Sequence, residues 1–412
     1  MKFTLTESWQ QKTLLFLLSQ TISLFGSSLV QYAITWYITL QTKSGMMMTI
    51  SIVCGFLPTF LLSPFAGVWA DRFNRKLLII LADGMIACAT LILAILYVLG
   101  YQAFWLLFVI SAIRAFGAAI QTPAVGALLP QLAPEAELTR VNAVNGSIQS
   151  LVMLLSPMLS ALLLSRASLE SIFFIDVVTA AVAITILLFF LHVPTHAKAL
   201  AKEKLSYFSD FRQGIGYVLQ HDFIKTLCLF NIAFCLLAAP GAFLTPLQVT
   251  RSFGDDVWRL TAIEITFSVG MMLGGAFMAW WGGFKNKLHT MVLANLIFGL
   301  CNIALGLIPA FWLYLCFMAL IGVAMPIFNT PTMVLIQQKV EENFLGRVFG
   351  VMTMISSSMM PLGMLVFGPL ADLVKIEWLL CGTGLLLCVQ ALFMVSNPVL
   401  IEAGKPMAEP ES

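Results

Sequence analysis

Long apolar stretches dominate this sequence. Twelve windows are long enough to span a bilayer as helices, which takes about 20 mostly apolar residues. Only 10% of the 412 residues are charged, against about 25% in ordinary soluble domains. The sequence therefore predicts an all-α integral membrane protein with twelve transmembrane helices. The windows lie near 14–38, 46–70, 77–99, 103–126, 141–165, 170–193, 222–249, 257–282, 288–309, 311–335, 347–371 and 376–398.

The distribution of Lys and Arg predicts the orientation of the chain. Basic residues in short loops favour the cytoplasmic side of a membrane. With the N-terminus inside, sixteen basic residues would lie on the cytoplasmic side, and both termini are expected there. Only five would lie outside, namely Lys43, Arg166, Arg251, Arg259 and Lys375.

The longest polar stretch, 194–221, divides the predicted spans six and six. We expect it to be a cytoplasmic linker with an amphipathic segment on the membrane surface. The remaining domains would be an N-terminal six-helix bundle over 1–193, a C-terminal six-helix bundle over 222–398 and a cytoplasmic tail over 399–412.

Short strings recur in the two halves in the same order. An offset near half the chain length indicates duplication of a six-helix unit, with chance matching of short strings as the alternative. The matched strings are Gln121-Thr122-Pro123 with Asn329-Thr330-Pro331, Arg140-Val141 with Arg347-Val348, and more weakly Phe73-Asn74-Arg75-Lys76 with Lys285-Asn286-Lys287-Leu288.

Four charged residues, Asp83, Arg114, Asp176 and Glu264, lie more than one helical turn from either end of a predicted span. A charge at the centre of a bilayer costs at least about 2.5–3.5 kcal/mol, so Arg114 should face the protein interior. It is either a structural arginine bonded to backbone carbonyls or a cavity residue coupled to protons or substrate. Asp176 either lines the cavity and takes part in proton coupling or favours the positive end of its own helix. Asp83 is expected to have a structural role, paired with the basic turn at 72–76.

Glu264 in the eighth span is the best acidic candidate for proton coupling. Low dielectric disfavours the charged form of a carboxylate, which allows it to exchange a proton for a cation. Thr261 and Ser268 lie one turn away on the same helix face. The alternative is a glutamate near the outer interface that reaches water by snorkelling.

The first span carries a polar stripe, because Gln20, Ser23, Ser27, Gln31 and Thr35 recur every three or four residues. The stripe predicts either helix–helix hydrogen bonds or one wall of a wet substrate cavity. We add to the candidate cavity the neighbouring aromatic residues and two polar residues of the repeated strings, namely Tyr32, Trp36, Gln121 and Asn329. Pro157 and Gly274 are expected to be structural, since small residues around them allow close helix packing.

A short charged stretch, Gly67-Val68-Trp69-Ala70-Asp71-Arg72-Phe73-Asn74-Arg75-Lys76, lies at the turn between the second and third spans. Its order resembles the loop between helices 2 and 3 of the major facilitator superfamily. Within that superfamily the chain is most similar to the bacterial macrolide-efflux branch of drug:proton antiporters. The supporting stretches include Gly55-Phe56-Leu57-Pro58, Ile263-Glu264-Ile265 and Leu345-Gly346-Arg347-Val348-Phe349.

The resemblance implies the major facilitator fold, with two six-helix bundles, in the bacterial cytoplasmic membrane. It implies a monomer that exports amphipathic drugs, with macrolides as one candidate, from the cytoplasm or inner leaflet by alternating access. The proton gradient would supply the energy in place of a cofactor. The family pattern also implies a cytoplasmic conformational latch, formed by Gly67, Asp71, Arg72, Arg75, Gly346 and Arg347.

Two other functions stay open at this stage. One is export of a native metabolite such as a siderophore or lysolipid, and the other is a non-transporting membrane receptor of the same fold. We do not expect an enzyme, a metal site or a nucleic-acid partner, since the four histidines form no ligand pattern and no Walker motif is present.

Overall fold

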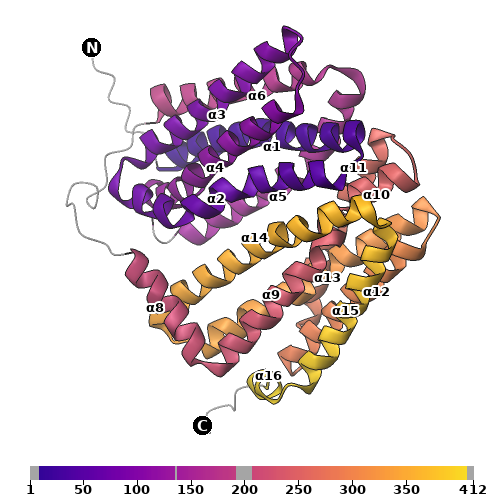
Figure 1. Cartoon of the computed structure of the whole chain (residues 1–412). Helices are drawn as coiled ribbons and strands as arrows, with labels where there is room; N and C mark the ends of the chain where they lie inside the picture. Colours follow the sequence, from indigo (N-terminus) through magenta and orange to yellow (C-terminus); the bar gives the residue numbers. More distant parts are fainter. Residues whose placement is uncertain (1–8, 135–136, 192–206, 406–412) are drawn as a thin grey trace. The chain divides into compact units, whose positions relative to one another are not determined.

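The computed structural model describes residues 9–134, 137–191 and 207–405 (Figure 1). At positions 63–64, 67–68, 71–72, 139, 207–211, 342–343 and 346 it describes the backbone only. All regular structure in these ranges is helical, and twelve helical segments are long and apolar enough to cross a membrane. The predicted fold class is therefore confirmed.

The helices follow one another with short connections. The seventh span combines α9 and α10, and the sixth ends in a π-helical segment, η2. The bounds of the helices are α1 Trp9–Thr42, α2 Gly45–Arg72, α3 Arg75–Val98, α4 Phe104–Leu132, α5 Leu138–Arg166, α6 Leu169–Thr185, η2 Ile186–Phe190, α8 Tyr207–Gln220, α9 Asp222–Phe243, α10 Thr245–Ser252, α11 Val257–Trp281, α12 Lys287–Leu307, α13 Phe311–Lys339, α14 Glu342–Leu373, α15 Ile376–Ser396 and α16 Pro398–Ala403.

The chain divides into two compact units. Unit 1 comprises Met1–Ile38 and Ile50–Tyr207, and unit 2 comprises Thr39–Thr49 and Phe208–Ser412. The turn between α1 and α2 therefore packs with unit 2, although most of both helices belongs to unit 1. Within the predicted linker the structure describes one helix, α8, while residues 192–206 lie outside the described ranges.

Helix pairing is repeated in the two units. In unit 1, α3 packs against α4 and α6, and in unit 2, α12 packs against α13 and α15. The third span of each half thus contacts the fourth and sixth spans of that half. This repetition supports duplication of a six-helix unit.

The weakest of the three sequence echoes has a structural counterpart. Asn74 and Asn286 are the N-caps of α3 and α12, and each side chain accepts a hydrogen bond from a backbone amide of the first turn. In each half the next residue then bonds a carbonyl five positions back. Arg75 Nε donates to Ala70 O (2.9 Å), and Lys287 Nζ donates to Gly282 O (2.9 Å). The same polar contacts therefore begin the third span of both units.

Close helix contact in unit 2 depends on glycine. A Cβ atom at Gly274 of α11 would lie 2.4 Å from the backbone oxygen of Val323 on α13. At Gly270, one turn earlier, the corresponding distance to Ala319 O would be 2.2 Å. Any side chain at either position would force the two helices apart.

Candidate functional site

A buried ion pair lies inside unit 1. Arg114 of α4 is 5% exposed, and its Nη1 donates to Oδ2 of Asp176 on α6, which is fully buried. Thr90 Oγ1 on α3 accepts from Arg114 Nη1 (2.6 Å) and donates to Asp176 Oδ2 (3.2 Å). From α1, the backbone oxygen of Ser27 accepts from Arg114 Nη2 (2.9 Å), and its hydroxyl donates to Asp176 Oδ1 (3.3 Å). Four helices thus converge on one pair of opposite charges.

The structure brings together residues that the sequence presented separately. Arg114, Asp176 and Ser27 were assigned to different spans, with no indication that they meet. Thr90 was not singled out at all, because a threonine within an apolar span is common and carries no signal of its own. The arginine bonds both a backbone carbonyl, as the structural interpretation expects, and a carboxylate, as the coupling interpretation requires.

A second polar cluster lies around Asp83 of α3, which is 2% exposed. Its Oδ1 accepts hydrogen bonds from Ser23 Oγ (2.8 Å) and from Gln121 Nε2 (2.8 Å). Gln121 Nε2 also lies 3.4 Å from Gln20 Oε1. Two of the predicted cavity residues, Gln20 and Gln121, thus contact each other next to this carboxylate.

The expected pairing of Asp83 with the basic turn is wrong for Arg75 and Lys76, the two cations of the turn whose side chains are described. Arg75 Nη1 donates to Ala127 O (2.8 Å), and Lys76 Nζ donates to Leu191 O (2.7 Å). Asp83 lies eight residues beyond Arg75 on the same helix, a rise of about 12 Å. It is therefore too far along α3 to reach the turn, and its partners come from α1 and α4 instead.

Glu264 of α11 lines a cavity of about 130 Å³ within unit 2. It is half-buried, and among the described residues it has neither a hydrogen-bond partner nor an ion-pair partner. The cavity has room for about four water molecules, so a small cationic or proton-carrying group fits beside the carboxylate. The other main lining residues are two polar groups, two phenylalanines and three methionines, namely Thr245, Asn302, Phe267, Phe298, Met318, Met325 and Met360.

The remaining predicted cavity residues differ in exposure. Gln31 and Asn329 are exposed, and Thr35 Oγ1 donates to the backbone oxygen of Gln31 (2.9 Å). Tyr32 is half-buried and stacks obliquely on Trp36, with ring centroids 5.6 Å apart, whereas Trp36 itself is buried. Trp36 therefore offers no open ring surface in this conformation.

The residues assigned to the cytoplasmic latch are only partly described. The side chains at positions 67, 71, 72 and 346 lie outside the described part, so the contact expected of Gly67, Asp71, Arg72 and Gly346 stays a prediction. The guanidinium of Arg347 lies 5.2 Å from the ring centroid of Phe344. The predicted structural residue Pro157 is buried inside α5.

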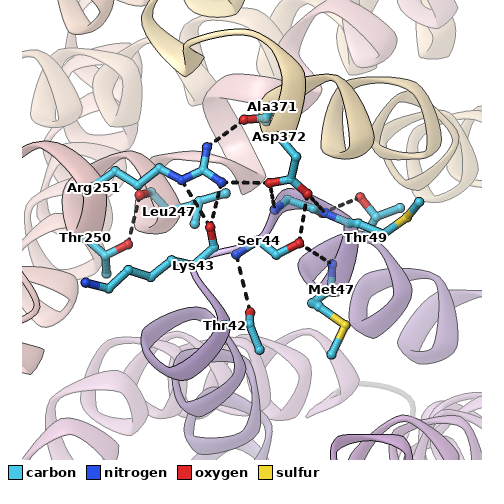
Figure 2. A network of polar contacts seen from close by, with 12 residues as sticks. Thr42, Lys43, Ser44, Met47, Thr49, Leu247, Thr250, Arg251, Ala371 and Asp372 are labelled. Carbon is cyan, nitrogen blue, oxygen red and sulfur yellow. Dashed lines mark hydrogen bonds and ion pairs between the residues drawn. The ribbon is translucent and has the colours of Figure 1, made fainter.

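A dense polar network, which no sequence pattern suggested, joins the turn between α1 and α2 to the rest of unit 2 (Figure 2). Asp372 of α14 accepts from the backbone amides of Gly45 (2.7 Å) and Met46 (2.9 Å) and from Ser44 Oγ (2.8 Å). Arg251 of α10 donates to Asp372 Oδ1 (2.7 Å). Asp372 therefore caps the start of α2, where a negative charge is favourable.

Arg251 also fixes the backbone of this turn. Its Nη2 and Nε donate to Lys43 O (2.6 and 3.1 Å), and its Nη1 donates to Ala371 O (2.6 Å). Lys43 has a positive φ of 47°, a conformation that is unfavourable for a residue with a side chain. These bonds therefore hold the turn, which belongs to Thr39–Thr49 of unit 2, against α10 and α14.

Asp372→Asn is expected to loosen the turn at the start of α2. The substitution removes the charge from an acceptor of four hydrogen bonds, each of which contributes about 1.5–3 kcal/mol when buried and less at this partly exposed site. Hydrogen–deuterium exchange at Gly45 and Met46 should become faster. The matched control is Asp255→Asn, which removes an exposed partner of Lys43 (2.6 Å) and should leave this exchange unchanged. Equal exchange in Asp372→Asn and the wild type would contradict the capping role.

In the described part of the chain, no group of three or more His, Cys, Asp or Glu side chains is placed to hold a metal ion.

Comparison with known proteins decides the family. A model described as Major Facilitator Superfamily matches residues 16–364. The chain belongs to this superfamily. It is a multi-pass membrane transporter of small molecules, and the expected major facilitator fold is confirmed.

Superfamily members that resemble this chain include drug exporters. Macrolide efflux protein A of Streptococcus pyogenes is 28% identical over 395 residues, which cover 95% of this chain and 97% of that protein. The protein of the same name from Enterococcus faecalis is 29% identical over 324 residues, covering 78% and 99%. The solved structure of a mutant of the nucleoside transporter NupG aligns with a TM-score of 0.72 at 14% identity, over 94% of this chain and 100% of that one, and so shares the fold.

Proposed function

We propose that this transporter exports amphipathic drugs, macrolides among them, in exchange for protons. The observation that carries the proposal is Glu264, a carboxylate without an ion-pair partner in the described part of the chain that lines a mostly apolar cavity inside a transmembrane unit. The similarity to proteins named for macrolide efflux supports the choice of substrate.

The cavity chemistry supports antiport in physical terms. A carboxylate in an apolar site is stabilised either by a bound proton or by the cationic group of a ligand, and the two cannot occupy it together. Methionine side chains such as Met318 and Met325 adapt their shape to varied apolar partners. Exchange at Glu264 would thus couple proton entry to drug release.

The ion pair of unit 1 is the second part of the proposed coupling machinery. Arg114 and Asp176 would keep a fixed charge arrangement on the four helices that they join while the halves alternate between inward and outward access. The transporter would work as a monomer in the bacterial cytoplasmic membrane, with both termini inside and the proton gradient as its only energy source.

The proposal is tested by drug accumulation in an efflux-deficient bacterium that expresses the chain. Labelled erythromycin, a macrolide, should accumulate less than in cells with the empty vector, and a protonophore should abolish the difference. Unchanged accumulation of several macrolides, with membrane expression verified, would contradict drug export. Reduced accumulation that resists the protonophore would contradict proton coupling.

A further inference from the structure

Unit 1 holds two fully buried carboxylates but only one buried cation among its described residues. Asp83 and Asp176 are 2% and 0% exposed, and Arg114 is 5% exposed. Ser23 and Ser27 of α1, one helical turn apart, donate to Asp83 and Asp176 respectively. The two carboxylates, one on α3 and one on α6, therefore face adjacent turns of α1.

Asp176 already has its counter-charge. Arg114 Nη1 donates to its Oδ2, and Ser27 and Thr90 donate to its two oxygens. The guanidinium also donates to two neutral oxygens, namely Thr90 Oγ1 and the backbone oxygen of Ser27. The hydrogen bonds of this cation are thus directed at Asp176 and its neighbours rather than at Asp83.

Asp83 has only neutral donors. Ser23 and Gln121 both donate to Oδ1, whereas Oδ2 is buried with no hydrogen-bond partner in the described part of the chain. Burying an ionised carboxylate without a counter-charge and with an unsatisfied oxygen is strongly unfavourable. A proton on Oδ2 removes the charge and leaves Oδ1 free to accept both hydrogen bonds.

The charged groups on the surrounding helices do not replace this proton. On α4 and α6 they are Arg114 and Asp176, which neutralise each other, with Glu170 in the first turn of α6. Lys12 lies in the first turn of α1, eleven residues before Ser23, at a rise of about 16 Å. Arg75 and Lys76 lie at the start of α3, bonded to backbone carbonyls.

We propose that Asp83 is a proton-binding site of the N-terminal unit, separate from Glu264, and that its proton is bound in this conformation. Release of the proton would leave a charge whose hydrogen-bond donors in the described part of the chain are Ser23 and Gln121. Gln121 would then be held by Asp83 and drawn away from Gln20, 3.4 Å distant. The participation of this proton in transport rests on the proposed function, whereas its presence on Asp83 does not.

The first test is the pH dependence of thermal stability of the purified full-length protein in detergent. A proton bound by the folded protein but not by the unfolded chain stabilises the fold at low pH, and this stabilisation is lost as the pH rises through the range of release. In the pH range where the folded protein holds the proton and the unfolded chain does not, the unfolding equilibrium constant rises about tenfold per pH unit for one proton. The melting midpoint of the wild type should therefore fall relative to that of Asp83→Asn as the pH rises.

The control is Asp222→Asn, which removes an exposed carboxylate paired with Lys225 and should leave the pH profile as in the wild type. A difference between Asp83→Asn and the wild type that is constant with pH would overturn the proposal.

A second measurement covers the case in which Asp83→Asn does not fold. The infrared carbonyl stretch of protonated carboxylic acids is recorded at neutral pH for the wild type and for Asp83→Glu, which keeps an acid at this position. A band that shifts between the two proteins assigns the proton to Asp83, and identical spectra would overturn the proposal. Neither measurement requires transport, so a failure of drug export in cells would be distinguished from a failure of this site.

Discussion

Glu264→Gln is expected to abolish proton-driven drug efflux while the protein still folds and reaches the membrane. Glutamine has nearly the same shape and fits the cavity, but it binds neither a proton nor a cation in the way a carboxylate does. Each exchanged proton can support about a tenfold drug gradient per unit of pH gradient. In Glu264→Gln this proton-driven drug gradient should disappear. Accumulation of labelled erythromycin should rise to that of cells without the transporter.

Two further variants make this result specific. Glu264→Asp keeps a titratable acid in the cavity and should retain part of the efflux. Glu402→Gln neutralises an exposed glutamate of α16 that pairs with Lys405 (2.5 Å) and should export as the wild type does. Full protonophore-sensitive efflux by Glu264→Gln would remove this residue from the coupling mechanism.

Arg114→Met is expected to destabilise the folded protein strongly. Removal of one partner of a buried ion pair leaves the other charge buried and uncompensated, which typically costs about 3–5 kcal/mol. Asp176 would be that charge, since its remaining donors are the hydroxyls of Ser27 and Thr90. The melting midpoint in detergent should fall sharply, and membrane yield should fall with it.

The double variant Arg114→Met/Asp176→Asn separates charge from packing. Replacement of both partners removes the uncompensated charge and should recover much of the lost stability. Arg166→Met, at the exposed C-terminal end of α5, is the control for loss of an arginine and should melt near the wild type. A single variant as stable as the wild type, or a double variant no better than the single, would contradict a tightly coupled pair.

The twelve spans were predictable because hydrocarbon thickness fixes the length of an apolar helix. Arg114 was predictable as an interior residue for a related reason, since a charge at that depth cannot face lipid. Its partner was not, because Asp176 lies on another helix and helical periodicity says nothing about which helices meet. The contact depends on how α1, α3, α4 and α6 pack.

The contacts of the two other polar clusters were also not predictable from the sequence. Asp83 was assigned to the basic turn because the two are close in sequence. It lies eight residues beyond Arg75 on α3, however, and its hydrogen-bond partners are on α1 and α4. In the sequence, Asp372 and Arg251 look like ordinary charges at span ends. Only packing of the turn at Ser44 against α14 shows that Asp372 caps α2 and that Arg251 bonds Asp372.

The central claim is tested most directly with the purified protein in liposomes that contain a pH-sensitive dye. Addition of erythromycin to the outside should cause proton movement across the membrane that is faster than in protein-free liposomes and that is lost in Glu264→Gln. Proton-coupled export would be contradicted if the protein made labelled erythromycin cross faster than in protein-free liposomes but left proton movement at the protein-free rate.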